Sequence, residues 1–391
     1  MNLYEQAENI RGRLIDYRRV LHQIPEIHCN LHNTMTFVTG RLQEMGVAYR
    51  IIEGGGIVAC IGNGRADKAF LLRADMDALP ITENSGEPFA SKNGCMHACG
   101  HDLHTAMLLG AAQLLKDNEA SLPGTVKLVF QCDEEGVTGM RTLIDGGLMT
   151  NPEVGAAMAL HVLPGIPAGA YHCAPGYASS AVDIFQIKIT GRSTHSATPQ
   201  DGVDAINVTT HIFLALQTIV SRELSASEVV TLTNGYLHAG TDAYNVIPGT
   251  AVLGGGIRSF NSETAEFART RLVEIAKNIA VAFHAECEVN FLSSAPACYN
   301  DEALVGLVEG VGNRLGMRPV VRGVEMVSED FAFLSRLIPS CLVWIGAGGP
   351  DARYQGCRLH DANVRFNEDV IPYGCALLTE CAVTWLSGRH T

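Results

Sequence analysis

Cysteine, histidine and acidic side chains are concentrated at two places in the first half of the chain. The run 94–104 reads Gly-Cys-Met-His-Ala-Cys-Gly-His-Asp-Leu-His and stands just before a predicted helix. First-row divalent metals prefer such ligands, and the Cys-Gly-His spacing lets Cys99 and His101 turn inward from one tight loop. An isolated Cys-Gly-His sequence is more often part of a surface loop beside a buried cysteine. A metal site therefore requires further ligands elsewhere in the chain.

Four further candidates lie later in the chain. Glu134 and Glu135 come directly after a predicted strand at 125–131. Adjacent carboxylates at the end of a strand point in different directions, so one can bind a metal while the other works as a general acid and base. His161 closes the next apolar run, and His360 lies far down the chain. Taken alone, each also fits a solvated acid pair or a hydrogen-bonded core histidine.

The predicted sheet gives these residues a common location. Strand-like runs alternate with helices, which favours an α/β layer with a largely parallel sheet. The runs are 57–62, 68–75, 125–131 and 155–161. Reactive groups of such sheets gather where strands end at their carboxyl side. Five ligands are therefore predicted to form a dinuclear metal site with one thiolate shared between the ions. They are Cys99, His101, Glu135, His161 and His360.

The order of elements predicts two domains in the 391 residues. Residues 181–292 read as strand, helix, strand, strand, helix and strand, the order of a ferredoxin-like α+β sandwich. After them the chain returns to helix, strand and helix. We therefore expect a discontinuous catalytic α/β domain, 1–180 and 293–391, whose mixed and largely parallel sheet is flanked by helices. The segment 181–292 would be an inserted lid or dimerisation domain.

Charge and the first residues restrict the partners. The chain has 28 basic and 41 acidic residues, a formal charge of -13, which repels phosphate backbones and anionic lipid surfaces. Neither nucleic acid nor a membrane is an expected partner. The first 26 residues mix charged and apolar types and contain no secretory signal pattern, so we expect a cytoplasmic protein.

Six short runs carry a resemblance to a known family. They are Arg73-Ala-Asp75-Met-Asp77-Ala-Leu-Pro80, His97-Ala-Cys99-Gly-His101-Asp-Leu-His104, Glu134-Glu135-Gly, Gly191-Arg-Ser-Thr-His195-Ser-Ala-Thr-Pro199, Asn245-Val-Ile-Pro248 and Ser328-Glu-Asp330-Phe. In order and context they closely resemble the M20 metallopeptidases. Within that family they are similar to the amidohydrolase branch, which includes hippurate hydrolases, N-acyl-amino-acid amidohydrolases and plant auxin-conjugate hydrolases. The resemblance extends over nearly the whole chain.

The resemblance implies roles for the residues near the metals. The implied ligands are Cys99 as the bridging thiolate, with His101, Glu135, His161 and His360. Glu134 resembles the general base that takes a proton from water and delivers it to the leaving amine. Asp75 resembles the acid that supports a ligand histidine, although Arg73 stands where other branches of the family have a histidine.

The resemblance also implies roles for three residues of the insert. His195 resembles the histidine that reaches from the lid domain, often of a partner subunit, to stabilise the oxyanion. Asn245 and Arg258 resemble the lid groups that hold the substrate carboxylate. A homodimer or homotetramer formed through the lid domain is therefore expected. One departure lies beside the base, where 131–135 reads Gln-Cys-Asp-Glu-Glu instead of the usual Gln-Pro-Ala-Glu-Glu.

These observations predict a dinuclear metal-dependent amidohydrolase for N-acyl amino acids of the hippurate, N-acetyl or indoleacetyl type. Zinc or manganese is expected, and cobalt or nickel is an alternative, because Cys/His/carboxylate sites accept all four. A dipeptidase or an N-acetyl-diaminopimelate-type deacetylase is the competing hydrolase. The non-enzymatic alternative is a small-molecule-binding sensor. A zinc deaminase fits less well, since the Pro-Cys-x-x-Cys half of its signature is absent.

Overall fold

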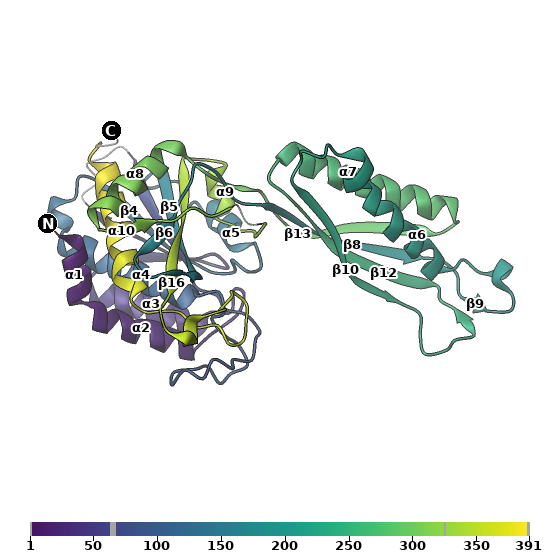
Figure 1. Ribbon diagram of the computed structural model, residues 1–391, viewed down its shortest axis with the longest axis horizontal. Helices are drawn as coiled ribbons and strands as arrows, with labels where there is room; N and C mark the ends of the chain where they lie inside the picture. Colours follow the sequence, from purple (N-terminus) through teal and green to yellow (C-terminus); the bar gives the residue numbers. More distant parts are fainter. Residues whose placement is uncertain (1, 63–67, 324–325, 389–391) are drawn as a thin grey trace. The chain divides into compact units, whose positions relative to one another are not determined.

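The protein is described by a computed structural model that covers residues 2–62, 68–323 and 326–388. It divides into two compact units. The second unit comprises Ser179–Ala297 and a short return segment that ends at Glu329, and the first comprises the remainder. Both ends of the chain belong to the first unit (Figure 1). The predicted insert, 181–292, is shorter than the second unit at both ends and lacks the return segment.

The larger sheet lies in the first unit and is mixed, with a parallel centre. Its described strands follow the order β1-β2-β4-β3-β5-β16-β6-β15. Their bounds are β1 Tyr49–Ile52, β2 Gly56–Gly62, β3 Ala69–Asp75, β4 Thr125–Gln131, β5 Val154–Pro167, β6 Ala170–His172, β15 Arg318–Pro319 and β16 Ser340–Gly348. The neighbours β4, β3, β5 and β16 pair in parallel, whereas β2 pairs antiparallel with β1 and β4. The predicted fold class is confirmed for this unit.

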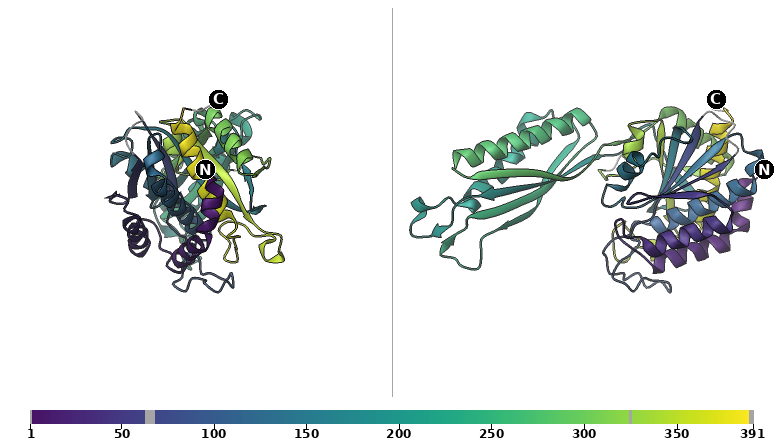
Figure 2. Two further views of the ribbon diagram at one scale, coloured as in Figure 1. Left: turned by 90° about the vertical axis from the view of Figure 1, so that its left-hand side faces the viewer. Right: turned by 180° about the vertical axis from the view of Figure 1, so that it is seen from behind.

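Two long helices cover the centre of that sheet. Helices α4 and α10 pack against each other and against β3, while α1 and α2 pack on them (Figure 2). Almost every side chain of α4 is buried, as expected for a helix enclosed on all sides. The helices of this unit are α1 Leu3–Asn9, α2 Arg11–Gln23, α3 His32–Glu44, α4 His101–Asp117, α5 Gly139–Asp145, α8 Glu302–Arg314, α9 Ala332–Ser335 and α10 Val370–Leu386.

The second unit has the predicted ferredoxin-like topology. Its strands are β8 Ala181–Thr190, β10 Val230–Ala239, β12 Thr250–Ser259 and β13 Glu286–Ala295, and its helices are α6 Ala205–Thr218 and α7 Ser262–Ala282. Within the described residues the sheet order is β10-β12-β8-β13, with every neighbouring pair antiparallel. Both helices lie on one face of this sheet (Figure 2) and enclose a core of its own. A small ribbon, β9 Thr194–His195 and β11 Val246–Ile247, extends from it.

Two further observations concern single elements. The first helical segment is divided into α1 and α2, because Ile10 has φ -105° and ψ 4°, outside the helical region. No helix in the described part of the chain is long and apolar enough to cross a membrane.

Candidate metal centre

A glycine brings the Cys-Gly-His loop close to the sheet. Gly100 has φ 89° and immediately precedes α4, whose first residue is His101. A Cβ atom at Gly100 would lie 2.3 Å from Cγ2 of Val162 on β5. Only glycine combines this backbone conformation with so close an approach. The loop residue Cys99 and the helix residue His101 are therefore held beside β5.

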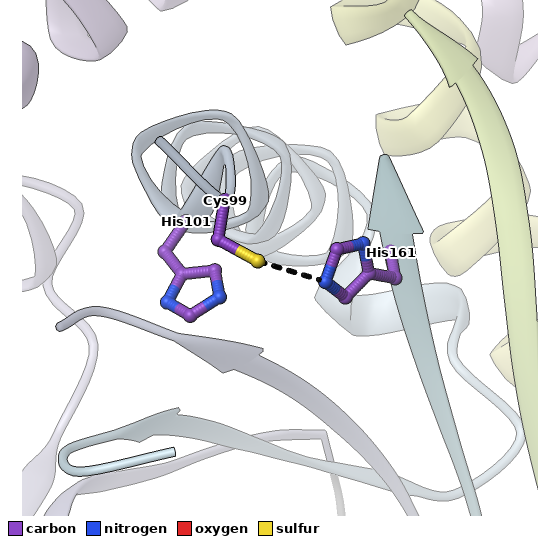
Figure 3. Close-up of side chains that lie close together, drawn as sticks. All are labelled: Cys99, His101 and His161. Atoms are coloured by element: carbon purple, nitrogen blue, oxygen red, sulfur yellow. Dashed lines mark hydrogen bonds between the residues drawn. The ribbon is translucent and has the colours of Figure 1, made fainter. Parts of the chain in front are cut away.

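Three of the predicted ligands form one buried group (Figure 3). The donor atoms of Cys99, His101 and His161 all lie within 4.8 Å of one another, and Cys99 Sγ is 3.4 Å from His161 Nε2. The strand containing His161 continues to Pro167, so this histidine does not end its strand as predicted. It lies two residues beyond Ala159, the last residue of β5 that pairs with β3, where the sheet opens.

Backbone carbonyls set the tautomers of the two buried imidazoles. His101 Nδ1 donates to the carbonyl oxygen of Asp77, and His161 Nδ1 donates to that of Val162, both over 2.9 Å. Each ring therefore uses Nδ1 for the backbone and leaves Nε2 for a ligand. His101 Nε2 is buried and has no hydrogen-bond partner among the described residues. A buried ring nitrogen without a hydrogen-bond partner fits a metal ligand. The mixture of thiolate, imidazole and carboxylate donors around it also fits a metal ion.

A second group shares Cys99 with the first. The donor atoms of Cys99, Glu135 and His360 lie within 4.8 Å of one another. His360 Nε2 is 3.3 Å from Cys99 Sγ and 3.3 Å from Glu135 Oε1. The backbone N–H of His360 donates to the carbonyl of Ala98, which holds this distant segment against the cysteine loop. The structure thus brings all five predicted ligand residues together, with the thiol common to both groups.

The electrostatics around His101 and His360 favour positive charge. Contacts with Cys99 and Glu135 raise the pKa of His360 to about 10. Burial opposes the charged form of His101, but Asp75 and Cys99 outweigh it and raise its pKa well above the usual value. Protons are attracted here because the surroundings are negative, and a divalent cation would be attracted for the same reason.

Glu134 is placed to act beside these groups. Its carboxylate lies within 4.8 Å of donor atoms of His101 and Glu135, and the residue is 7% exposed. The two glutamates follow the end of β4 in a loop whose backbone is strained, since Asp133 has φ 55° and Val137 has φ 61°. Positive φ is rare for a β-branched residue, and such conformations persist only where surrounding contacts enforce them.

The unusual residue Asp133 is part of those contacts. Its carboxylate is 2.9 Å from His28 Nδ1 and also accepts a hydrogen bond from the Thr138 hydroxyl. Its carbonyl accepts the N–H groups of Thr138 and Gly139. The departure from the usual Pro-Ala therefore closes the loop that presents Glu134.

Two supporting residues were assigned no role from the sequence. His104 Nδ1 donates to Asp75 over 2.6 Å, and His104 Nε2 accepts the N–H of Val162 on β5. Asp77 accepts the backbone N–H of Glu135 over 3.0 Å in addition to its contact with His101. Both residues stand in the runs that carry the family resemblance, which was the available signal. Asp75 itself is 2.6 Å from His104 and 3.6 Å from His101 Nε2.

Two of the predicted residues of the second unit lie together on the β9–β11 ribbon. His195 pairs with Val246 across the ribbon, and the N–H of Ser196 donates to the carbonyl of Asn245. His195 and Asn245 are both exposed. The N–H of Ala197 donates to His195 Nδ1 over 3.0 Å, which leaves Nε2 as the protonated nitrogen and an available donor.

Arg258 lies at the other end of the same unit. It stands near the end of β12, and its guanidinium donates to the carbonyl of Met326 over 2.8 Å. The ribbon joins β12 at Thr250, eight residues away, which corresponds to ~26 Å along a strand. The structure therefore groups His195 with Asn245 and separates both from Arg258.

Known proteins give the geometry a context. Residues 71–384 match peptidase family M20/M25/M40. The chain is 38% identical over 342 residues to an N-acetyl-L-cysteine deacetylase of Bacillus subtilis (strain 168), which covers 87% of this chain and 82% of the relative. It is 35% identical over 391 residues to the IAA-amino acid hydrolase ILR1-like 5 of Arabidopsis thaliana, covering 97% and 88% of the two chains.

A solved structure agrees with these relatives. The YxeP protein of Bacillus subtilis, described as a dinuclear metal-binding peptidase of the M20 family, superposes with a TM-score of 0.80 at 32% identity. The match covers 97% of this chain and 99% of that chain. Family match, relatives and donor cluster lead to one conclusion. The chain belongs to the M20 peptidase family, in its amidohydrolase branch, and is a metal-dependent hydrolase of amide bonds.

Proposed function

We propose that this protein hydrolyses the amide bond of N-acyl amino acids with two divalent metal ions, zinc or manganese. One observation carries the proposal: the Cys99 thiol belongs to two donor groups, which are completed by different residues beside Glu134. A shared ligand flanked by two sets of donors is the arrangement of a dinuclear site. The relatives named for N-acetyl-cysteine and for indoleacetyl-amino acids support this substrate class.

Amide hydrolysis has two difficult steps, attack by water and departure of the amine, and different groups of the site would serve them. Bound cations would supply Lewis-acid activation of water and of the amide carbonyl. Glu134, with its carboxylate beside His101 and Glu135, would take a proton from the attacking water and return it to the amine nitrogen as the C–N bond breaks. The Nε2–H group of His195 would donate to the oxygen that carries negative charge in the tetrahedral state.

We assign His195 to the site of a partner subunit in a homodimer. Within one chain Arg258 lies ~26 Å along β12 from Thr250, where the ribbon that contains His195 meets that strand. This span is much longer than an N-acyl amino acid. A second copy would supply His195 and Asn245 to a substrate whose carboxylate contacts Arg258. Co-expression of His195→Ala and Glu134→Gln chains tests this. Mixed dimers should regain activity that neither variant has, and failure of stable mixed dimers to regain it would exclude sharing.

The substrate class is tested with a panel. The metal-reconstituted protein is incubated with N-acetyl, N-benzoyl and N-indolylacetyl amino acids and with dipeptides, and free amine is measured. Chelator-treated protein is the matched control. We expect metal-dependent release from N-acyl amino acids. Preferential cleavage of dipeptides would make the protein a dipeptidase, and selectivity for N-acetyl-diaminopimelate would make it a deacetylase of that type. Binding without turnover of any compound would favour the sensor.

A further inference from the structure

A positively charged side chain is buried inside the larger sheet, next to the metal-binding residues. Arg73 lies on β3 and its side chain has 0% of its surface exposed. Its three nitrogens donate in three directions: Nε to Gln131 over 2.8 Å, Nη1 to Asp75 over 2.7 Å and Nη2 to Asp330 over 3.0 Å. A buried charge is retained only where its partners satisfy it. We call these four residues the Arg73 cluster.

Asp330 connects this cluster to a distant part of the chain. Its carboxylate is fully buried and accepts from Arg73, from Gln131 Nε2 over 2.6–2.7 Å and from the N–H of Met140 over 3.0 Å. It is the residue immediately after the return segment of the second unit, which ends at Glu329. Donors of β3, of β4 and of the first turns of α5 therefore fix the point at which the chain re-enters the first unit.

Asp75 carries the connection toward the predicted ligands. One oxygen accepts from Arg73, and the other accepts from His104, 2.6 Å away. His104 in turn accepts the N–H of Val162, the neighbour of His161. His101 Nε2 is 3.6 Å from Asp75. Asp75 thus contacts His104 directly and, through it, the part of β5 that contains His161.

We propose that Arg73 and Asp330 are positioning residues of the metal site, which hold Asp75 in place and through it orient His104 and the adjoining part of β5 that contains His161. The inference rests on the proposed function in that the site must bind metal, and it assigns a role to the Ser328-Glu-Asp330-Phe run. Neither residue touches substrate. The fork of the guanidinium is required, because a lysine ammonium cannot reach Gln131, Asp75 and Asp330 in three fixed directions.

Two variants test the assignment. Asp330→Asn keeps the shape but turns one acceptor into a donor that faces the N–H groups of Gln131 or Met140. Arg73→Lys keeps the charge but removes the fork. Metal retention is measured as the chelator concentration that removes half of the bound zinc or manganese, by elemental analysis. We expect each variant to lose affinity by about 10- to 100-fold, the range for groups that support a ligand from behind.

Lys127→Met is the matched control. Like Arg73, Lys127 is a buried basic residue, but it lies on β4. Its ammonium donates to the carbonyls of Leu148, Thr150 and Pro152 over 2.7–3.0 Å. This variant leaves three acceptors unpaired, so its urea midpoint should fall while its metal retention stays unchanged. The comparison separates loss of stability from loss of positioning.

The outcomes are distinct. Unchanged metal retention in folded Asp330→Asn would overturn the proposal, as would an equal loss in Lys127→Met at the same urea midpoint. If Arg73→Lys does not fold, Asp330→Asn decides the question. Failure of the proposed function would look different, since the wild-type protein would then retain metal and cleave no compound of the panel.

Discussion

The two units present their candidate functional residues in opposite ways. In the first unit, Cys99, His101 and His161 are 0–7% exposed, and backbone carbonyls hold the two imidazoles in place. In the second unit, His195 and Asn245 are exposed on a two-stranded ribbon whose hydrogen bonds are mainly those of its own backbone. One set is fixed by its surroundings, and the other is displayed to solvent.

The difference in burial determines what the metal-site residues and the ribbon residues can each do by themselves. Buried donors with assigned tautomers are preorganised, so a ligand gains from them without reordering the protein. Exposed side chains on a ribbon have little to orient them until something else contacts them. Variants of the first unit should therefore alter metal binding, chemistry and stability, whereas variants of the ribbon should alter chemistry alone.

The largest expected effect comes from Glu134→Gln. The amide cannot accept and return a proton, and general acid–base catalysis typically contributes about 10²–10⁴-fold in rate. We expect kcat to fall by that amount while both metals remain bound, as measured by steady-state kinetics and elemental analysis. A variant that kept full turnover would remove Glu134 from the chemistry.

The ribbon is tested by His195→Ala. Loss of one donor to the oxyanion typically costs about 10²–10³-fold in kcat. Because the side chain is exposed, the free energy of unfolding should change by no more than about 0.5 kcal/mol, and metal content should not change. An effect on KM alone would instead describe a residue that binds substrate and transition state equally.

Cys99→Ser tests the buried set. The hydroxyl is a poor replacement for a thiolate that belongs to both donor groups, so metal affinity should fall by at least about 10–100-fold. The half-saturating metal concentration, measured by calorimetry on the metal-free protein, reports the change. Equal metal content in the variant and the wild type after dialysis would argue against a thiolate ligand.

The smallest effect is a pH dependence confined to the first unit. Burial opposes the charged form of His22, but Asp102 and Glu83 outweigh it and raise its pKa above the usual value. A raised pKa stabilises the fold below about pH 6.5, and this contribution is lost as pH rises through the folded-state pKa. Each unit of raised pKa contributes about 1.4 kcal/mol.

The contribution of His22 is obtained as the difference in unfolding free energy between the wild type and His22→Gln. Urea unfolding of the wild type and of His22→Gln is measured from pH 6 to 9, on the metal-loaded protein. The stability gap between the two should narrow as pH rises. A gap that is constant with pH would mean that His22 is uncharged in the folded protein.

Much of the fold was predictable because long elements carry periodic patterns. The predicted run 125–131 coincides with β4, and the predicted insert begins at residue 181, the first residue of β8. The short strands β1, β6 and β15 were not predicted, since two to four residues are too few for a pattern. The break between α1 and α2 at Ile10 has no signal in the sequence, because it interrupts the backbone without interrupting the apolar spacing.

The candidate site was predictable in its side chains and not in its supports. Cysteine, histidine and glutamate have chemistry that the sequence displays, and the structure brings those five residues together. The carbonyls that orient His101 and His161 belong to the backbone. Every residue has a backbone carbonyl, so the amino-acid sequence does not show which ones form these hydrogen bonds. Arg73 was noticed as a departure, but its partner Asp330 lies 257 positions away. The roles of His195, Asn245 and Arg258 stay predictions.

The ligand set is unequal in its access to water. The side chain of His360 is 51% exposed, whereas His101 is fully buried. On the proposed dinuclear site, an ion bound by His360 and Glu135 would therefore exchange with the medium first, and an ion bound by His101 and His161 would exchange slowly. Chelation of the loaded protein should proceed in two kinetic phases of equal amplitude. The enzyme would then pass through a half-loaded form whenever metal becomes scarce, and the supply of one ion would control its activity.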